Sequence, residues 1–418
     1  PMCYDSRMSG MSATYMAMVD SVLNAGKLFF MECDSRTVYF ENDTMTPALT
    51  QEWGKTYTLR ETIEQMKRDF ASVLTKGAGL WWYDMNGGWF DDAEIYDLLS
   101  VMKAEADANV ADPGQNVSRI AWVSDDDIIN TTPYHFDGTY GVTNYAHYYQ
   151  KEELAHVGAP HDMLYLSDLE KGIAKDYDVY LINAVNLDEE EVAALDKIKK
   201  DGVTIIWVGI PGIYAQDGSL SAERISSITG INVAITTDPL PYSVRTEGEH
   251  ALLNGFSSEI YGNRTIVSGT VTPVAYITDT EATVLGKLTD TDKAGLAVKE
   301  IEAQGGGTWT SVYSSVACIP AEIIRNALKE QGGHVYLETK GDALFVNSRY
   351  IGVNSPYGGQ RTLYLESASD VYDVFTGECV AQNVTSFDFE IGEGCTRLFK
   401  VVAPGTQVNP IVPVNDGG

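Results

Sequence analysis

Two short segments near the start of the chain constrain its fold more than any other feature. Residues 27–37 and 79–92 each contain an apolar run of the kind found in a buried parallel strand. Each run is followed by acidic and aromatic side chains at the point where the strand would give way to a loop. Barrels of alternating strands and helices place their functional residues at such strand ends. The two segments therefore predict neighbouring βα repeats with a pocket at their carboxyl ends.

The surrounding sequence supports this prediction, because helical and extended patterns alternate. Thr58 is a predicted N-cap, and Glu61 completes a capping box at the start of a long helix. Two βα repeats cannot close an eight-stranded barrel, so this region is at most the last quarter of one. The chain opens on Pro1 and passes at once into helical pattern, which predicts a start inside a larger chain. The expected elements are helices 13–25, 59–76 and 92–107 and strands 27–32 and 79–84.

A second α/β region follows the linker Asp112-Pro113-Gly114 and extends over residues 117–332. Its strand and helix order predicts an open, doubly wound sheet of flavodoxin-like type. Beyond Gly332-Gly333 the helical pattern stops, and short strands predict a small antiparallel β-sandwich over 333–403, with a disordered tail at 404–418. The expected elements of the middle region are strands 118–124, 162–166, 178–184, 203–209 and 309–316 and helices 188–201 and 320–331. Those of the last region are strands 334–338, 343–347, 361–366, 371–375, 386–391 and 396–402.

Charge and composition exclude several classes of protein. The formal net charge of -30 opposes binding to nucleic acid and to anionic membrane surfaces, and no basic patch reverses it locally. No apolar run approaches the roughly 20 residues of a membrane-spanning helix. The chain is therefore expected to be soluble, either cytoplasmic or secreted. N-x-S/T sequons at Asn42, Asn116, Asn130, Asn263 and Asn383 give weak support to secretion.

The five cysteines are far apart and show no CxxC spacing, so neither a zinc ribbon nor a disulfide scaffold is indicated. Cys379 and Cys395 would be able to pair across two C-terminal strands, although free thiols are favoured. Histidines at 135, 147, 156 and 161 lack the spacing of a zinc motif. Asp125-Asp126-Asp127 would be able to hold a divalent cation at a sheet edge, but a solvated acidic loop is the preferred interpretation. No metal and no cofactor is predicted.

The motifs G-K-x-F-x-x-E-x-D-x-R-T at 26–37 and G-L-W-W-x-D-x-x-G-G-W-[FY]-D at 79–91 resemble a known family. They are similar to the end of the catalytic barrel of β-galactosidase-like glycoside hydrolases of family 42. The order that follows resembles the trimerisation domain and the C-terminal β domain of those enzymes. The resemblance implies a retaining hydrolase of β-galactoside-like or related glycosides, with a carbohydrate as partner and a homo-oligomeric assembly.

The resemblance also implies the catalytic residue. The nucleophile of such enzymes is a glutamate near the end of a late barrel strand, and Glu32 occupies that place. A carboxylate there must be held by donors, for which Arg36 is the nearest candidate. Without the resemblance, Glu32 would be interpreted as a surface acid at a strand end.

The predicted substrate-binding residues surround this glutamate in sequence. Carboxylates accept hydrogen bonds from sugar hydroxyls, and flat rings cover the C–H faces of a pyranose. Trp81 and Trp82 cannot both face the pocket, because neighbouring strand residues point to opposite faces. Trp89 is the preferred stacking platform, with a lid residue packed on a helix as the alternative, while Tyr39 and Trp53 lie in a loop long enough to reach the site. Aspartates after strands are often only turn or cap residues. The predicted binding set is Asp34, Arg36, Trp82, Asp84 and Trp89.

The general acid that the family pattern requires is not found in this sequence. Family members carry it on a middle barrel strand beside an asparagine, and nothing before Glu32 offers that pair, so it is expected upstream of Pro1. A non-catalytic carbohydrate-binding or assembly module is therefore the alternative function. An amidotransferase-like hydrolase would need a nucleophile in the turn Val208-Gly209-Ile210-Pro211-Gly212, which contains neither thiol nor hydroxyl.

Overall fold

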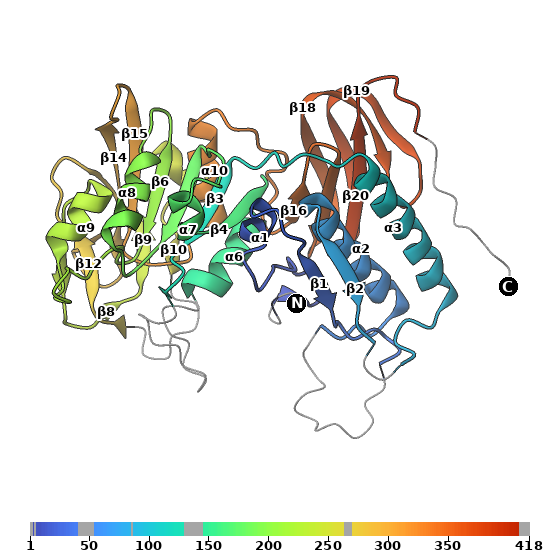
Figure 1. Cartoon of the computed structure of the whole chain (residues 1–418), viewed down its shortest axis with the longest axis horizontal. Helices are drawn as coiled ribbons and strands as arrows, with labels where there is room; N and C mark the ends of the chain where they lie inside the picture. The colour runs from blue at the N-terminus through green and yellow to red at the C-terminus, as the bar shows by residue number, and fades with distance from the viewer. Residues whose placement is uncertain are drawn as a thin grey trace. The chain divides into compact units, whose positions relative to one another are not determined.

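The computed structural model of the chain describes residues 3, 6–40, 54–84, 87–128, 145–262 and 270–408 (Figure 1). The chain divides into two compact units. Unit 1 contains Pro1–Ser118, Ala155–Pro160 and Val335–Gly418, and unit 2 contains Arg119–Leu154 and His161–His334. The sequence prediction treated the N-terminal βα region and the C-terminal strands as separate domains, whereas the structure joins them in unit 1.

Unit 1 begins with the two expected βα repeats. Strands β1 (Phe30–Cys33) and β2 (Gly79–Trp82) pair in parallel, with helix α2 (Leu59–Lys76) between them and helix α3 (Ala93–Ala111) after them. The predicted capping box of α2 is confirmed, because the Thr58 side chain accepts the N–H of Glu61 and the Glu61 side chain accepts the backbone N–H of Thr58.

The helix expected at 13–25 is much shorter than predicted. Helix α1 spans only Val19–Asn24, and the chain before it is irregular, with Ala13 at a positive φ of 50°. The buried guanidinium of Arg68 on α2 donates to the backbone carbonyls of Arg7, Met8 and Met11. These bonds hold the chain before residue 13 as a loop. Within the predicted helix, the carbonyl of Thr14 accepts the backbone N–H of Cys3 and that of Tyr15 accepts the Cys3 thiol, so both carbonyls have partners outside a helix.

The C-terminal strands of unit 1 form one five-stranded antiparallel sheet, so the predicted β-sandwich is wrong for the described residues. Helix α2 lies against this sheet and supplies the second layer (Figure 1). A Cβ on Gly352 would lie 2.9 Å from Cβ of Ala71, so glycine permits the close approach of strand to helix. The strands are β16 (Ala343–Val346), β17 (Tyr350–Ser355), β18 (Gly359–Asp373), β19 (Cys379–Ile391) and β20 (Cys395–Val402), in the order β16-β17-β20-β18-β19.

Unit 2 is built on a parallel-rich sheet. Its parallel strands run β4-β3-β5-β6-β15, which is the order 2-1-3-4-5 of flavodoxin-like folds. One face is covered by helices α7, α8 and α9, whose apolar side chains pack around Trp207 and Tyr313. The strands are β3 (Ile120–Ser124), β4 (His161–Tyr165), β5 (Val179–Asn183), β6 (Thr204–Val208) and β15 (Thr308–Ser314). The helices are η3 (Tyr145–Tyr149), α6 (Gln150–Ala155), α7 (Leu166–Glu170), α8 (Glu189–Lys197), α9 (Ala222–Thr229), η4 (Ala251–Leu253) and α10 (Ala321–Glu330).

An antiparallel extension of this sheet was not predicted. It continues from β15 through β14, β13, β9 and β10, and β7 and β12 form a branch. These strands are β7 (Val233–Thr236), β9 (Ser243–Thr246), β10 (Ile260–Gly262), β12 (Val274–Ile277), β13 (Thr283–Leu288) and β14 (Ala294–Glu302), with β8 (Leu240–Pro241) and β11 (Thr270–Val271) forming a separate pair. Within the described ranges, no helix is both long and apolar enough to cross a membrane.

Candidate functional site

The two faces of the β1/β2 pair have opposite character. Leu80 and Trp82 on one face pack against a core that includes Met66 and Phe70 of α2 and Ile95 of α3. Successive strand residues point to opposite sides, so Phe30, Glu32 and Trp81 lie on the other face. Phe30 and Trp81 are exposed there, at 55% and 39%. The helices therefore cover one face of this sheet, and the other is open.

Glu32 lies on the open face, directly beside Trp81 in the parallel register. Its side chain is half-buried and has no hydrogen-bond or ion-pair partner among the described residues. The rings of Trp81 and Tyr83 are in edge contact at 5.1 Å between centroids. A Cβ on Gly79 would lie 2.4 Å from the Phe30 ring, so only glycine leaves room for that ring over β2. The open face thus presents one carboxylate flanked by aromatic rings.

Trp82 belongs to the other face, which corrects its selection as a sugar-binding residue. It is paired with Cys33, and its ring lies 6.0 Å from that of Phe90 within the core formed by α2 and α3. The expectation that only one of the two adjacent tryptophans faces the site agrees with this geometry. The register selects Trp81, because Trp81 rather than Trp82 is the partner of Glu32.

Asp34 is held in a buried ion-pair cluster immediately after β1. Its Oδ1 accepts a hydrogen bond from Arg7, and its Oδ2 lies 3.5 Å from Nη1 of Arg36. Arg36 also donates to the backbone carbonyl of Asp34 at 2.9 Å. All three residues are buried. Arg36, which was expected to hold Glu32, therefore contacts Asp34 instead, and Asp34 fixes the end of the strand.

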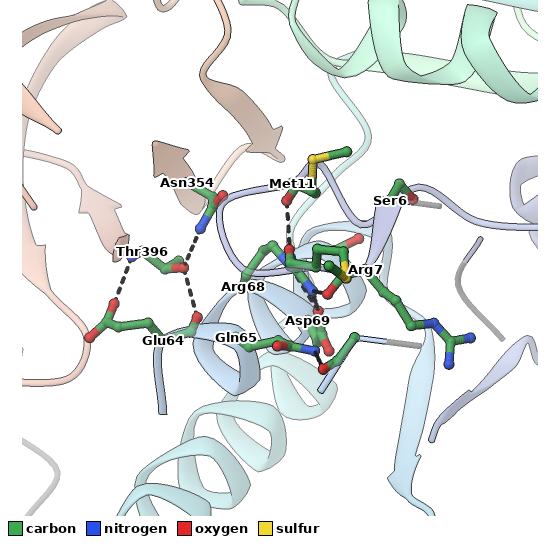
Figure 2. Close-up of polar contacts among 12 residues, drawn as sticks. Ser6, Arg7, Met11, Glu64, Gln65, Arg68, Asp69, Asn354 and Thr396 are labelled. Carbon is green, nitrogen blue, oxygen red and sulfur yellow. Dashed lines mark hydrogen bonds and ion pairs between the residues drawn. The ribbon is translucent and has the colours of Figure 1, made fainter. Parts of the chain in front are cut away.

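Arg68 and Asp69 on α2 extend this cluster (Figure 2). Both are fully buried, and Nη2 of Arg68 lies 2.9 Å from Oδ1 of Asp69. Burial raises the pKa of the Asp69 carboxyl, and the neighbouring Arg68 and Arg7 oppose that shift. Burial and the Asp69 charge likewise raise the pKa of the Cys33 thiol, next to Glu32 in the chain. Oδ2 of Asp69 and Oε1 of Gln65 have no hydrogen-bond partner among the described residues.

This ion-pair cluster contains Arg7, Arg36 and Arg68 against Asp34 and Asp69. The side chains of Arg36 and Asp69 also line a small cavity together with Trp82. The cluster lies around the end of β1 and ties that strand end to α2 and to the N-terminal segment.

Trp89 is buried, at 2% exposure, and has no open ring face for a sugar. Its ring packs edge-on against Phe40 at 5.1 Å, and the guanidinium of Arg36 lies 5.7 Å from its centroid. Asp84 accepts the backbone N–H of Trp89 at 3.1 Å, which is the turn role that the sequence left open for it. The preference for Trp89 as the stacking platform is therefore wrong in this structure, because its ring packs inside unit 1.

Of the two aromatic residues predicted in the loop after Glu32, the structure describes Tyr39. Tyr39 is exposed, and its hydroxyl donates to Asp92, which caps the start of α3. This hydrogen bond raises the pKa of Tyr39 and lowers that of Asp92. Trp53 lies outside the described residues, as do His135 and the sequons at Asn42, Asn130 and Asn263.

The other candidate sites, the acidic loop at Asp125 and the turn at Gly209, both lie in unit 2 and make structural contacts. Asp125 is buried and accepts the N–H of Asp127 at 2.7 Å, while Asp126 accepts the N–H and the hydroxyl of Ser167. No group of three or more His, Cys, Asp or Glu side chains suited to a metal occurs within the described ranges. The turn at Gly209 bonds through its backbone to Ser314 and Tyr313 and carries no nucleophile. The five cysteines, all among the described residues, form no disulfide.

Two important side chains were missed by the sequence analysis. Arg7 was not selected because it lies in irregular chain with no periodic pattern, and only the fold brings it to Asp34. Arg68 was not selected because its position in α2 looks like that of any helical arginine. A fully buried arginine inside a capped amphipathic helix leaves no separate sequence signal.

Comparisons with known proteins agree with this architecture at the level of the fold. No family model matches the chain, and no curated protein sequence is detectably similar to it. Among solved structures, a GH42 β-galactosidase from G. stearothermophilus aligns with a TM-score of 0.55 and 15% identity over 90% of this chain and 54% of that one. A β-galactosidase from a Rahnella species aligns with a TM-score of 0.50 and 13% identity over 84% of this chain and 53% of that one. The chain thus spans about half the length of these structures, and its fold is similar to theirs.

Proposed function

We propose that this chain carries the nucleophile half of the active site of a retaining glycoside hydrolase acting on β-galactoside-like substrates, with Glu32 as nucleophile. The observation that carries the proposal is the position of Glu32 on the face of the β1/β2 sheet that α2 and α3 leave uncovered. In a barrel of alternating strands and helices, the helices cover the outside of the sheet. The uncovered face is then the interior, where a catalytic carboxylate belongs.

The exposed apolar surface supports a larger barrel. A two-stranded parallel sheet with one bare face is unusual, because parallel sheets are normally buried on both sides. Leu28 and Phe30 are 73% and 55% exposed on or beside β1. Further strands, from an upstream segment or a partner chain, would cover these side chains. The same strands would be the source of the general acid that the family pattern requires.

The chemistry of Glu32 suits attack on an anomeric carbon. A nucleophilic carboxylate must be ionised and must not be tied up by another side chain. The Glu32 carboxylate has no partner among the described residues, so no described side chain ties it up. Asp34 is a poor alternative, because both of its oxygens face arginine side chains.

The aromatic residues beside Glu32 suit a sugar ring. Trp81 is exposed, and Tyr83 packs edge-on against it, so the indole is braced while one side remains open to solvent. An indole face placed next to a carboxylate covers the C–H face of a pyranose while the acid meets its anomeric carbon.

The test uses a substrate that needs no general acid. Dinitrophenolate is a good leaving group without protonation, so dinitrophenyl β-galactoside reports on the nucleophile alone. We expect the 418-residue chain to release dinitrophenolate in a single-turnover assay and Glu32→Gln to lose that release. Glu61→Gln is the matched control, because Glu61 is a half-buried acid whose capping role glutamine preserves.

The alternative of a non-catalytic binding module gives a different result. In that case, the same acidic and aromatic residues would hold the glycoside without cleaving it, so the chain would release no dinitrophenolate and Glu32→Gln would affect binding alone. Release that persists at the original rate in Glu32→Gln would contradict the assignment of the nucleophile.

A further inference from the structure

The C-terminal sheet of unit 1 contains a cavity of about 370 Å³ that is separate from the open face of β1 and β2. It lies where strand β18 leaves its neighbour β20. The register of β18 against β19 shifts between Tyr364 and Ser369, and β18 pairs with β20 only from Asp370 onward. The irregular stretch therefore separates residues 365–369 from residues 401–404, and the cavity fills the space between them.

The cavity wall combines hydroxyl groups with one acid. Burial and the nearby Glu366 carboxylate raise the pKa of the Tyr336 hydroxyl, and both residues line the cavity. Glu366 and Ser367 are exposed, so their polar atoms are available to a ligand from solvent. Ser369 also lines the wall, and its hydroxyl donates to the carbonyl of Ser367.

Asn347 places a buried side-chain amide on the same wall, and one group of that amide lacks a hydrogen-bond partner within the described part of the chain. Asn347 is 3% exposed, and its Oδ1 accepts the backbone N–H groups of Arg349 and Tyr350, each at 2.9 Å. Its Nδ2 has no hydrogen-bond partner among the described residues. This amide packs against Gly114 and is inaccessible to solvent, so the polar groups that a ligand can reach are those of Glu366 and Ser367.

The remaining wall is aliphatic, and this mixture defines the ligand class. Ile351, Leu365, Val401 and Val402 supply apolar surface. Among the described residues of the lining, Glu366 is the one that carries a charge, and none is a lysine, arginine or histidine. Anions are therefore disfavoured, and a single carboxylate is too few ligands for a tightly held metal. The volume lies within the range of small-molecule pockets.

We propose that this cavity binds a neutral polyhydroxylated ring, such as a monosaccharide or one sugar unit of a larger glycan. The Glu366 carboxylate and the serine groups meet the ring hydroxyls, and the aliphatic wall meets the C–H surface. The site is independent of Glu32 and serves to hold carbohydrate, without cleaving it.

The experiment follows methyl resonances of the 418-residue chain by NMR while methyl β-galactoside is added. The methyl of Ile351 reports on the cavity, and that of Leu285, in the core of unit 2, is the internal reference. We expect a saturable shift of the Ile351 signal and no shift of the Leu285 signal. Glu366→Gln should weaken the affinity by about tenfold or more, because a hydrogen bond to a charged acceptor is lost. Ala368→Trp, at an exposed lining position, should abolish the shift.

Two controls separate this site from the proposed catalytic one. Glu378→Gln removes an exposed carboxylate of the same sheet that does not line the cavity, and it should leave the affinity unchanged. Trp81→Ala should also leave the Ile351 shift intact, even if the proposed nucleophile site fails every test. Cyclohexanol, a ring of similar size with one hydroxyl, should not bind.

Three results would overturn the proposal. One is a shift that grows linearly with sugar concentration, which would indicate solvent effects only. Another is equal affinity in Glu366→Gln and Glu378→Gln. The third is cyclohexanol binding as tightly as the glycoside, which would identify an apolar pocket with no preference for sugars.

Discussion

Replacing Arg68 with methionine tests whether the buried ion-pair cluster holds the N-terminal segment in place. Arg68 is fully buried and donates to three backbone carbonyls, those of Arg7, Met8 and Met11, at 2.9, 2.6 and 3.0 Å. Figure 2 shows its side chain between Met11 and Asp69. Methionine fills a similar volume but offers no donor, so the substitution removes the hydrogen bonds without creating a large cavity.

The expected loss of stability in Arg68→Met depends on the groups that the substitution leaves without partners. Asp69 would be left as a buried carboxylate without its partner, and breaking a buried pair in this way costs about 3–5 kcal/mol. The three carbonyls also lose their buried donor. Part of the cost is recovered by protonation, because burial already raises the pKa of Asp69. We therefore expect a local destabilisation of about 3 kcal/mol in the segment at residues 6–14.

Hydrogen exchange with mass spectrometry measures this locally, which matters because the chain has two units that need not unfold together. Exchange in residues 6–14 should become faster by on the order of a hundredfold. Lys103→Met is the control. Lys103 pairs with Asp107 on the exposed surface of α3, and the loss should stay below about 1 kcal/mol. Unchanged exchange in residues 6–14 of Arg68→Met would refute the argument.

Three further predictions concern other parts of the molecule. Burial raises the pKa of Glu191 from 4.5 to about 7, so its contribution to stability is full below pH 4.5 and is lost as the pH rises through about 7. Between pH 4.5 and 7, the melting temperature of Glu191→Gln should fall less than that of the unchanged chain. An equal fall in both proteins would contradict this. Trp82→Ala should cost about 2 kcal/mol in urea unfolding, whereas Trp81→Ala should weaken glycoside binding with little loss of stability; the reverse pattern would invalidate the assignment of faces. Gly352→Val should cost about 1–3 kcal/mol, because its side chain would meet α2, and a neutral effect would show that the sheet can shift.

The sequence predicted elements best where local signals agree with the tertiary structure. Helix α2 begins after a capping box and ends at Gly77 with a left-handed φ of 68°, and its predicted limits match the observed ones. The parallel strands of unit 2 are buried on both faces and read as continuous apolar runs, so they too were found. The helix expected at 13–25 is shortened because the carbonyls of Thr14 and Tyr15 accept from Cys3, and such tertiary contacts outweigh local propensity.

The candidate site was only partly predictable for a similar reason. The position of Glu32 at a strand end is visible in sequence, but the choice between Trp81 and Trp82 depends on the strand register. The burial of Trp89 depends on Phe40 and Arg36, which reach it only through the fold. Arg7 has no sequence signal, since its partner Asp34 lies on a different element.

The most direct test of the central claim is covalent labelling of Glu32. A 2-deoxy-2-fluoro-β-galactoside with a dinitrophenyl leaving group transfers its sugar to a nucleophilic carboxylate, and the fluorine slows release of the intermediate. The account predicts one added fluorosugar in the intact mass, located at Glu32 by peptide mapping and absent from Glu32→Gln. A label on another carboxylate, or no label under conditions where the glycoside binds, would contradict the role of Glu32 as nucleophile.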